Sequence, residues 1–332
     1  MSGTAPEYAV VVPTLGRPSL SATLRALAAA GGPPPRRVVL VDDRPPRECG
    51  PLPVEVPSAL APLVAVVPGA AAGPAAARNV GWRAAEEEWI AFLDDDVLPG
   101  RDWAARLAAD LAAAADARVA GSQGRISVPL PDDRAPTDWE RSTAGLATAR
   151  WITADMAYRR SALAAVGGFD ERFRRAFRED ADLALRLLAD GWLLAEGERR
   201  TLHPVRPADR WVSVRAQRGN ADDVLMTRIH GRDWWHRAGA GRGRLPRHLA
   251  TTAAAAGALA AAAARRPWTA AACAGVWGLG TGEFLCARLR PGPCEREELL
   301  TMALSSLLIP PAASFHWLRA WLGPLPAREE GT

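Results

Sequence analysis

Four short apolar runs in the first 94 residues most strongly limit what this chain can fold into. They are YAVVVPT (8–14), RRVVLVDDR (36–44), PLVAVVPG (62–69) and WIAFLD (89–94). Residues 19–31, which begin with serine and end with glycine, and residues 73–88 both read as helices. Strands that alternate with helices indicate a parallel sheet with helices on both faces. The sequence therefore predicts a Rossmann-like, mostly parallel α/β sheet.

The pattern changes further along the chain and suggests three regions. Residues 119–128 and 193–205 are expected to be strands, and residues 179–192 a helix that ends at a glycine. We expect the α/β domain to occupy residues 1–215. Residues 216–245 are rich in glycine and arginine, which favours a mobile connection that covers the active site. Residues 246–332 are expected to form a helical C-terminal region.

Acidic side chains follow two of the expected strands. Asp42 and Asp43 end the second run, and Asp94, Asp95 and Asp96 end the fourth. Ligands of open α/β sheets bind at the carboxyl ends of the strands, and carboxylates there can hold Mg²⁺ or Mn²⁺ together with a substrate phosphate. A plain solvated turn or a helix cap is the alternative for each cluster taken alone.

A third acidic pair, Glu179 and Asp180, stands at the start of an expected helix. Acids favour this position because the helix N-terminus is electropositive, so capping alone could explain the pair. The functional alternative is a general base held at the edge of the sheet.

Composition excludes some classes of function. All 41 basic residues are arginine, the net charge is +4, and the arginines are scattered without a nucleic-acid-binding motif. The richness in Ala, Arg, Gly and Pro is typical of a GC-rich bacterial genome. The four cysteines, Cys49, Cys273, Cys286 and Cys294, lack metal-ligand spacing. We expect a reduced, cytoplasmic protein that binds no nucleic acid.

In order along residues 8–215, these segments resemble the inverting family-two glycosyltransferases, which have the GT-A fold. The resembling segments are VVVPTLGRPSLSATLRAL, VVLVDDR, AARNVGWRAA, FLDDDV, and AYRRSALAAVGGFDERF followed by EDADLALRL. Each motif alone is weak, but five in the right order are specific. The Gln-x-x-Arg-Trp motif of processive members is not found, which favours transfer of a single sugar.

The resemblance implies a role for each matching residue. Asp43, or less readily Asp42, would meet the nucleobase, and Asp180, with Glu179 beside it, would deprotonate the acceptor. Asp96 would ligate the metal, with Asp94 near it and His203 as a further ligand or a purely structural histidine. The remaining candidates are Pro13, Thr14, Arg78 and Asp95 on the donor nucleotide, Arg215 and Arg218 in a basic loop over the diphosphate, and Trp151 and Asp155 on the acceptor side.

The implied reaction is direct displacement, which inverts the anomeric carbon. The donor would be a nucleotide-diphosphate sugar, with UDP favoured over GDP or dTDP, and the cofactor a divalent cation, Mn²⁺ or Mg²⁺. The acceptor would be a glycan, a lipid-linked molecule or a small molecule. Two alternatives remain: a sugar nucleotidyltransferase, and a catalytically inactive binding module with the same fold.

Three apolar stretches occur in the C-terminal region, over residues 249–264, 267–282 and 299–315. Each is shorter than the roughly 20 residues that a spanning helix needs. Arginine and tryptophan at their boundaries would suit a membrane interface on the inner face of the cell membrane. An alanine-rich helical bundle packed on the α/β domain is the other interpretation.

Overall fold

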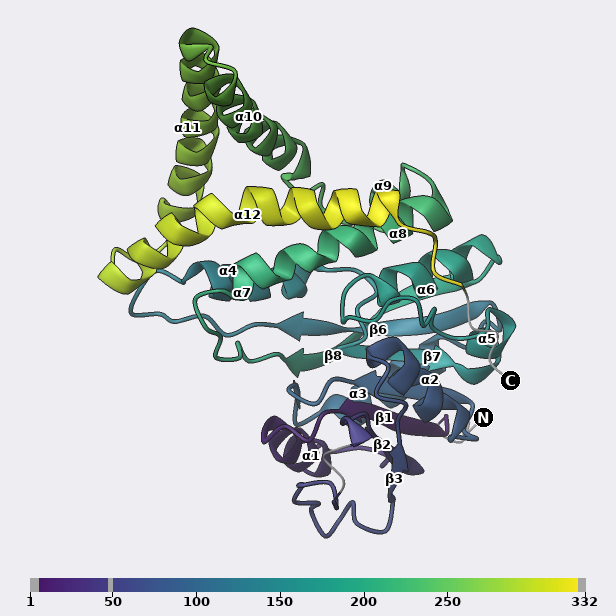
Figure 1. Cartoon of the computed structure of the whole chain (residues 1–332). Helices are drawn as coiled ribbons and strands as arrows, with labels where there is room; N and C mark the ends of the chain where they lie inside the picture. Colours follow the sequence, from purple (N-terminus) through teal and green to yellow (C-terminus); the bar gives the residue numbers. More distant parts are fainter. Residues whose placement is uncertain (1–5, 47–49, 328–332) are drawn as a thin grey trace.

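The computed structural model describes residues 6–46 and 50–327, so Cys49 lies outside the described residues. In this part of the chain one eight-stranded sheet has the order β3-β2-β1-β4-β7-β6-β8-β5 (Figure 1). The strands are β1 (Tyr8–Thr14), β2 (Arg37–Asp42), β3 (Val64–Pro68), β4 (Trp89–Leu93), β5 (Leu98–Pro99), β6 (Val119–Ser127), β7 (Asp155–Arg159) and β8 (Leu193–Leu202).

The sheet is mixed, and four of its seven described strand pairs are parallel, in line with the expected mostly parallel sheet. Strands β1 to β4 are parallel to one another and β6 is parallel to β8, as predicted. Strand β7 is antiparallel to both β4 and β6, and β5 is antiparallel to β8. The segment 128–154 leaves β6 and enters β7 at the same edge of the sheet, so β7 must run back against its neighbours.

Helices cover both faces of the sheet, as predicted. On one face α1 (Ser19–Ala28) and α3 (Trp103–Ala113) bury Leu20, Leu24 and Leu107 against the strands. On the other face lie α2 (Pro74–Arg83), α5 (Arg160–Ala165) and α6 (Glu179–Ala189). The strands between them are buried on both sides, which explains why they read as continuous apolar runs.

The segment 216–245, predicted to be a mobile connection over the active site, is largely helical. It holds the 3₁₀ turn η3 (Ala216–Arg218), α8 (Gly219–His230) and α9 (Trp234–Arg237). Met226 and Trp234 of these helices share a core with Phe173 and Leu185 of the α/β domain. A common core of this kind means that residue 215 does not separate two independently packed units.

The last three helices form a layer over the sheet and a projection from it (Figure 1). Helix α12 (Arg296–Leu322) packs along α8, while α10 (Leu245–Ala263) and α11 (Pro267–Leu289) form a hairpin that extends away from the body. Helices α11 and α12 are long and apolar enough to cross a membrane. The remaining short helices are α4 (Asp138–Ala144), η2 (Gly145–Thr148) and α7 (Val212–Arg215).

Candidate functional site

A cavity of about 580 Å³ opens where β1, β2 and β4 end. Its position follows from the parallel strands, whose carboxyl ends meet at one edge of the sheet. Acidic side chains and arginines line it together, and several of them form ion pairs. The lining residues include Pro13, Thr14, Arg17, Asp43, Gly73, Arg78, Asp94, Asp95, Asp96, Arg174, Arg175 and Arg206.

Asp43, rather than Asp42, faces this cavity. The Asp42 carboxylate accepts two hydrogen bonds from the Arg44 guanidinium, at 2.8 and 2.7 Å, and Arg44 lowers the pKa of Asp42. Asp43 Oδ2 accepts a hydrogen bond from the Gly73 amide at 3.1 Å, while its buried Oδ1 has no hydrogen-bond partner. Burial raises the pKa of Asp43. A buried acceptor without a partner is costly unless a ligand supplies the donor.

Gly73 allows the loop before α2 to close this side of the cavity. Its φ of 101° lies in the region that side chains rarely adopt, and a Cβ there would lie 2.5 Å from the Arg174 carbonyl oxygen. Glycine is therefore required at position 73 for two reasons: the backbone conformation is unfavourable for other residues, and a side chain would not fit.

The three aspartates of the triplet make different contacts. Asp95 is buried and ties the strand ends together, because it accepts hydrogen bonds from Thr14 Oγ1 at 2.7 Å and Arg17 Nη1 at 2.9 Å. Asp94 accepts one from Arg78 Nη2 at 2.9 Å. Asp95 thus holds the loop in place, which leaves Asp94 and Asp96 as the two members of the triplet that come together with His203.

Asp94, Asp96 and His203 come together as a candidate metal site. One ligand atom of each lies within 4.8 Å of the others. His203 Nδ1 lies 3.2 Å from the Pro204 carbonyl oxygen, so a hydrogen on Nδ1 can be donated there and Nε2 is left as the ligand atom. Two carboxylates and an imidazole are donors that suit Mn²⁺ or Mg²⁺.

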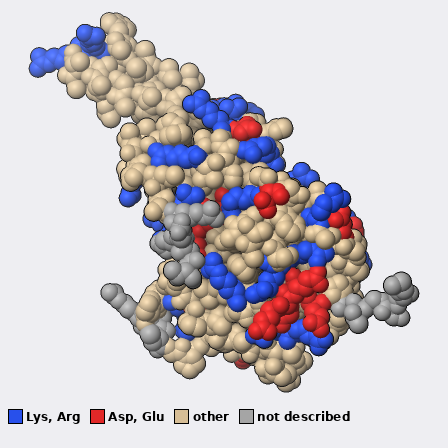
Figure 2. Space-filling model, turned by 90° about the vertical axis from the view of Figure 1, so that its right-hand side faces the viewer, with Lys and Arg blue, Asp and Glu red and all other residues tan. Residues whose placement is uncertain are grey.

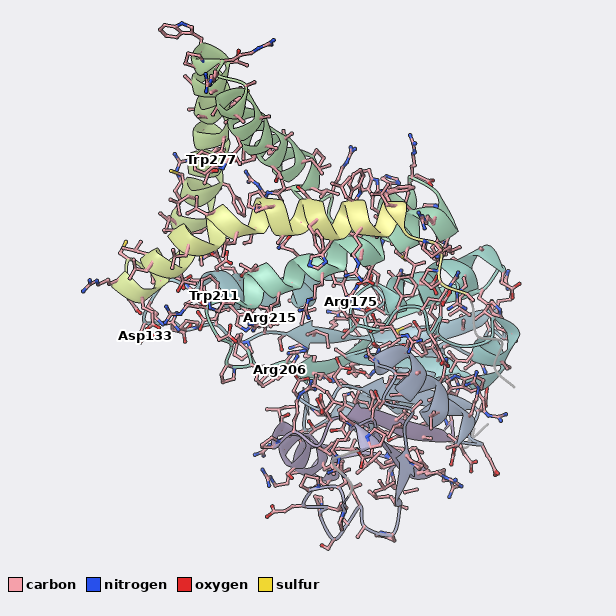
Figure 3. All side chains as sticks on the ribbon, viewed as in Figure 1. Asp133, Arg175, Arg206, Trp211, Arg215 and Trp277 are labelled. Atoms are coloured by element: carbon pink, nitrogen blue, oxygen red, sulfur yellow. The ribbon has the colours of Figure 1, made fainter. Side chains whose placement is uncertain are left out.

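Arg206 is one of the basic residues lining this cavity that sequence reasoning missed, together with Arg17, Arg174 and Arg175. Its Nε lies 2.8 Å from Asp96 Oδ2, and in Figure 3 it lies just beyond the end of β8. Burial raises the pKa of Asp96, as does the nearby Asp94, whereas Arg206 opposes the shift. The signal in the sequence was the short run VRPADR after His203, three residues from a candidate ligand.

The expected basic loop at Arg215 and Arg218 lies elsewhere in this structure, which corrects that expectation. Arg215 donates to both oxygens of Asp209, at 2.9 and 2.8 Å, and sits on α7 (Figure 3). Arg218 lines a different cavity, beside His316. Neither lines the cavity at the strand ends, because the segment is helical and turns these side chains outward.

Arg78 is buried between the aspartate triplet and helix α6. Its Nη1 donates to Glu179 Oε1 at 2.8 Å, and Nη2 donates to Asp94. Burial alone would lower the pKa of Arg78, but the charges of Asp94 and Glu179 raise it. The positive charge of Arg78 thus offsets the negative charges of Asp94 and Glu179, which come from two different elements. This explains how several carboxyl groups can lie close together here.

Asp180 stands next to this ion pair at the start of α6. Burial raises the pKa of Asp180, and the charge of Asp94 raises it further, while Arg78 and Arg178 oppose the shift. Burial also raises the pKa of Glu179. Arg178, just before the helix, has a left-handed φ of 77°, an unusual conformation for a non-glycine residue. A partly exposed carboxyl with a raised pKa suits a general base.

The two acceptor-side candidates do not face the cavity. The Asp155 carboxylate is fully buried and accepts hydrogen bonds from Arg199, Trp103 and Thr201 at 2.6–2.8 Å. Trp151 is also buried and packs against the Arg150 guanidinium. Asp155 therefore holds strands β7 and β8 to helix α3, which corrects the expectation that it meets an acceptor.

Comparison with known proteins agrees with this geometry. Residues 9–173 match the model "Glycosyl transferase family 2". The chain is 32% identical over 171 residues to the pre-mycofactocin glycosyltransferase of Mycobacterium tuberculosis, in strains CDC 1551 / Oshkosh and ATCC 25618 / H37Rv. The match covers 47% of this chain and only 35% of those relatives.

A solved structure extends the likeness of fold to nearly the whole chain. It is the mannosyltransferase PcManGT from Pyrobaculum calidifontis, in complex with GDP-Man and Mn²⁺. The two superpose with a TM-score of 0.55 at 22% identity, covering 95% of this chain and 88% of that one. The family match, the ordered acidic motifs and the GT-A-like sheet agree that residues 9–173 form a glycosyltransferase family 2 domain.

Proposed function

We propose that this protein transfers one sugar from a nucleotide-diphosphate sugar to an acceptor hydroxyl, with inversion at the anomeric carbon. The observation that carries the proposal is that one cavity is lined by a buried carboxylate oxygen of Asp43 without a partner, by two members of a metal-type donor set, and by arginines. The acids and arginines complement the two ends of a nucleoside diphosphate held by a cation. Family membership of residues 9–173 supports the same reaction class.

The donor nucleotide would lie with its base against Asp43. The unpartnered Asp43 Oδ1 can accept an N–H from the base edge. Uracil, thymine and guanine all present such an N–H, so UDP, dTDP and GDP sugars are the candidates. UDP sugars are our first choice, and the GDP-mannose complex of the Pyrobaculum protein makes GDP sugars the second.

The residues present fit a divalent cation. Asp96 is buried, and its Oδ2 has no hydrogen-bond partner among the described residues, although Arg206 Nε lies 2.8 Å away; this oxygen can turn to a cation once the guanidinium moves. Asp94, Asp96 and His203 would hold the ion. When bound, such an ion supplies positive charge to the leaving diphosphate. Arg206, displaced from Asp96, is placed to contact the diphosphate oxygens.

Asp180 would act as the base. Its carboxylate takes the proton from the acceptor hydroxyl while that oxygen forms a bond to the anomeric carbon. The bond from this carbon to the diphosphate oxygen breaks on the opposite face, and the nucleoside diphosphate leaves. A single displacement inverts the configuration. Arg78 donates a hydrogen bond to Glu179 beside Asp180 and fixes the start of α6 against Asp94.

Hydrolysis of nucleotide sugars separates this proposal from its alternatives. The full chain with Mn²⁺ should release nucleoside diphosphate from one donor of a UDP-, GDP- and dTDP-sugar panel, slowly with water and faster with the right acceptor. EDTA should stop the release. A nucleotidyltransferase would instead need a nucleoside triphosphate and release pyrophosphate, and a binding module would release nothing. Equal rates with and without EDTA would refute the metal role.

The donor substrates are made in the cytoplasm, and we propose that the catalytic domain works there. The acceptor could be a glycan, a small molecule or a lipid-linked molecule. Identification of the sugar in the released product, by chromatography against standards, would narrow the donor before any acceptor is known.

A further inference from the structure

The α10–α11 hairpin carries two uncharged stretches of equal length. Residues 249–264 and residues 267–282 have sixteen residues each. Arg265 and Arg266 lie between them at the tip, and Arg247 and Glu283 mark the other ends. Figure 2 shows the projection as an almost uncharged surface with basic residues at its tip. The hairpin is therefore an uncharged band bounded by charge at both ends.

This band is exposed in the structure. Trp268, Leu279 and Leu259 are 87%, 77% and 74% exposed, and Val276 is 57% exposed. In the most apolar 18-residue stretch of α11, only 11% is buried within the structure. Helices that are apolar on all sides are normally buried in a protein core or in a membrane. Since α10 and α11 contact mainly each other and, near their base, α12, no described part of this chain covers them.

We propose that the α10–α11 hairpin crosses the hydrocarbon layer of a lipid bilayer and that α12 lies along the bilayer surface beside it. Sixteen helical residues span about 24 Å, against a hydrocarbon thickness of about 30 Å. Long arginine side chains extend toward the headgroups, so Arg265 and Arg266 bridge the difference at the tip. Trp268, one turn away, takes the interfacial position that tryptophan favours.

Charge fixes the orientation of the hairpin. Two arginines lie at its tip, whereas six flank its base, at positions 242, 244, 247, 288, 290 and 296. Positive charge accumulates on the cytoplasmic side of membrane helices. The base, and with it the α/β domain, therefore faces the cytoplasm, on the side where nucleotide sugars are found.

Helix α12 has the pattern of a helix that lies in the interface. Met302, Ile309 and Ala313 are buried against the body, whereas Leu300, Leu308 and Phe315 on other sides are 53%, 45% and 57% exposed. In Figure 1 α12 lies across the top of the molecule while the hairpin rises from it. An apolar strip along such a helix suits the boundary between headgroups and acyl chains.

A second copy of the chain fits this surface less well than a bilayer. The two tip arginines would need acidic partners in a protein interface. Glu283 is the one acidic residue between positions 245 and 289, and it already pairs with Arg244 and Arg247. Anionic lipid headgroups offer the tip many such partners.

Vesicle flotation of the full chain tests the proposal. Protein purified in mild detergent is mixed with phosphatidylcholine and phosphatidylglycerol vesicles (7:3), and the detergent is removed. The wild type should float, and 0.5 M NaCl should not release it. Leu279→Asp should lower the floating fraction at least tenfold. Leu193→Asp, the same substitution at a 45% exposed leucine of the α/β domain, should leave flotation unchanged.

A thiol placed at the tip distinguishes crossing from lying flat. In a variant with its four cysteines changed to serine, Arg266→Cys should resist a membrane-impermeant maleimide until the vesicles are opened. Immediate labelling would show that the hairpin lies on the outer surface and would overturn the crossing. Failure to float, with a dimer in sedimentation equilibrium that Leu279→Asp dissociates, would assign the surface to a second copy instead. Flotation, thiol labelling and sedimentation do not require enzymatic activity, so their outcomes do not depend on whether the proposed function is correct.

Discussion

At the scale of single residues, Asp180 has the sharpest consequence. We expect Asp180→Asn to lower kcat by about 10²–10⁴-fold, since the amide has the same shape and cannot take a proton. Donor affinity, measured by calorimetry with Mn²⁺, should change little because Asp180 is expected to act on the acceptor. A parallel collapse of donor affinity would make Asp180 a donor-binding residue instead.

The pH dependence follows from the same carboxyl. Burial raises the pKa of Asp180, so the proton stays on at pH values where an ordinary aspartate has lost it. The base is active only when deprotonated, and the rate should therefore fall as pH drops through this raised pKa. The acidic limb of the kcat profile is expected above the ordinary aspartate value of 3.8. A rate that is flat down to that pH would contradict the assignment.

At the scale of elements, Arg78 joins helix α2 to β4 and α6. Arg78→Met would leave Glu179 and Asp94 without their shared cation, and loss of one partner from a buried ion pair costs about 3–5 kcal/mol. We expect urea unfolding to show a loss of this size. Arg83→Met, on the same helix but with a half-exposed side chain, is the control and should cost far less.

Helix α4 offers a test of acid sensitivity. Arg134 and the Thr137 capping box hold the pKa of Glu140 at about 2, well below its ordinary value of 4.5. The lowered pKa stabilises the folded protein above pH 4.5, and this stabilisation is lost as pH falls toward 2. Glu140→Gln should thus be less stable than wild type at pH 7, with the gap closing below pH 4. A difference in stability that does not change with pH would instead indicate that the substitution disturbs the packing of the Glu140 side chain.

How much of this could be read from the sequence differs between elements. Strands β1, β2 and β4 were predictable because each is a short apolar run, and the runs of β2 and β4 end at acids. The reversal of β7 was not, since strand direction depends on where the 128–154 segment returns. The role of Asp155 could not be predicted for a similar reason, because it depends on Arg199, which lies 44 residues away along the chain. Arg206 was missed because its contact with Asp96 joins distant parts of the chain, and its nearness in sequence to His203 was the only local sign.

At the scale of the whole molecule, donor and metal should stabilise the fold together. A ligand at a hundredfold excess over its Kd adds about 2.7 kcal/mol to the free energy of unfolding. For a chain of this length that corresponds to a rise in Tm of about 4 °C. Differential scanning fluorimetry should show the rise with Mn²⁺ plus the correct nucleotide, and Asp96→Asn should abolish it. A full shift without any divalent ion would separate nucleotide binding from the metal.

The order of the strands also has a consequence for synthesis of the chain. Strand β5 closes the sheet only when it meets β8, so the α/β domain cannot be completed before residue 202 is made. About 45 further residues precede the first uncharged stretch of the hairpin, and a ribosome adds them in about 2–9 s. Mixed α/β domains fold within milliseconds to seconds. The enzyme body can therefore finish folding in water before its most apolar segment leaves the ribosome, which separates the two tasks in time as well as in space.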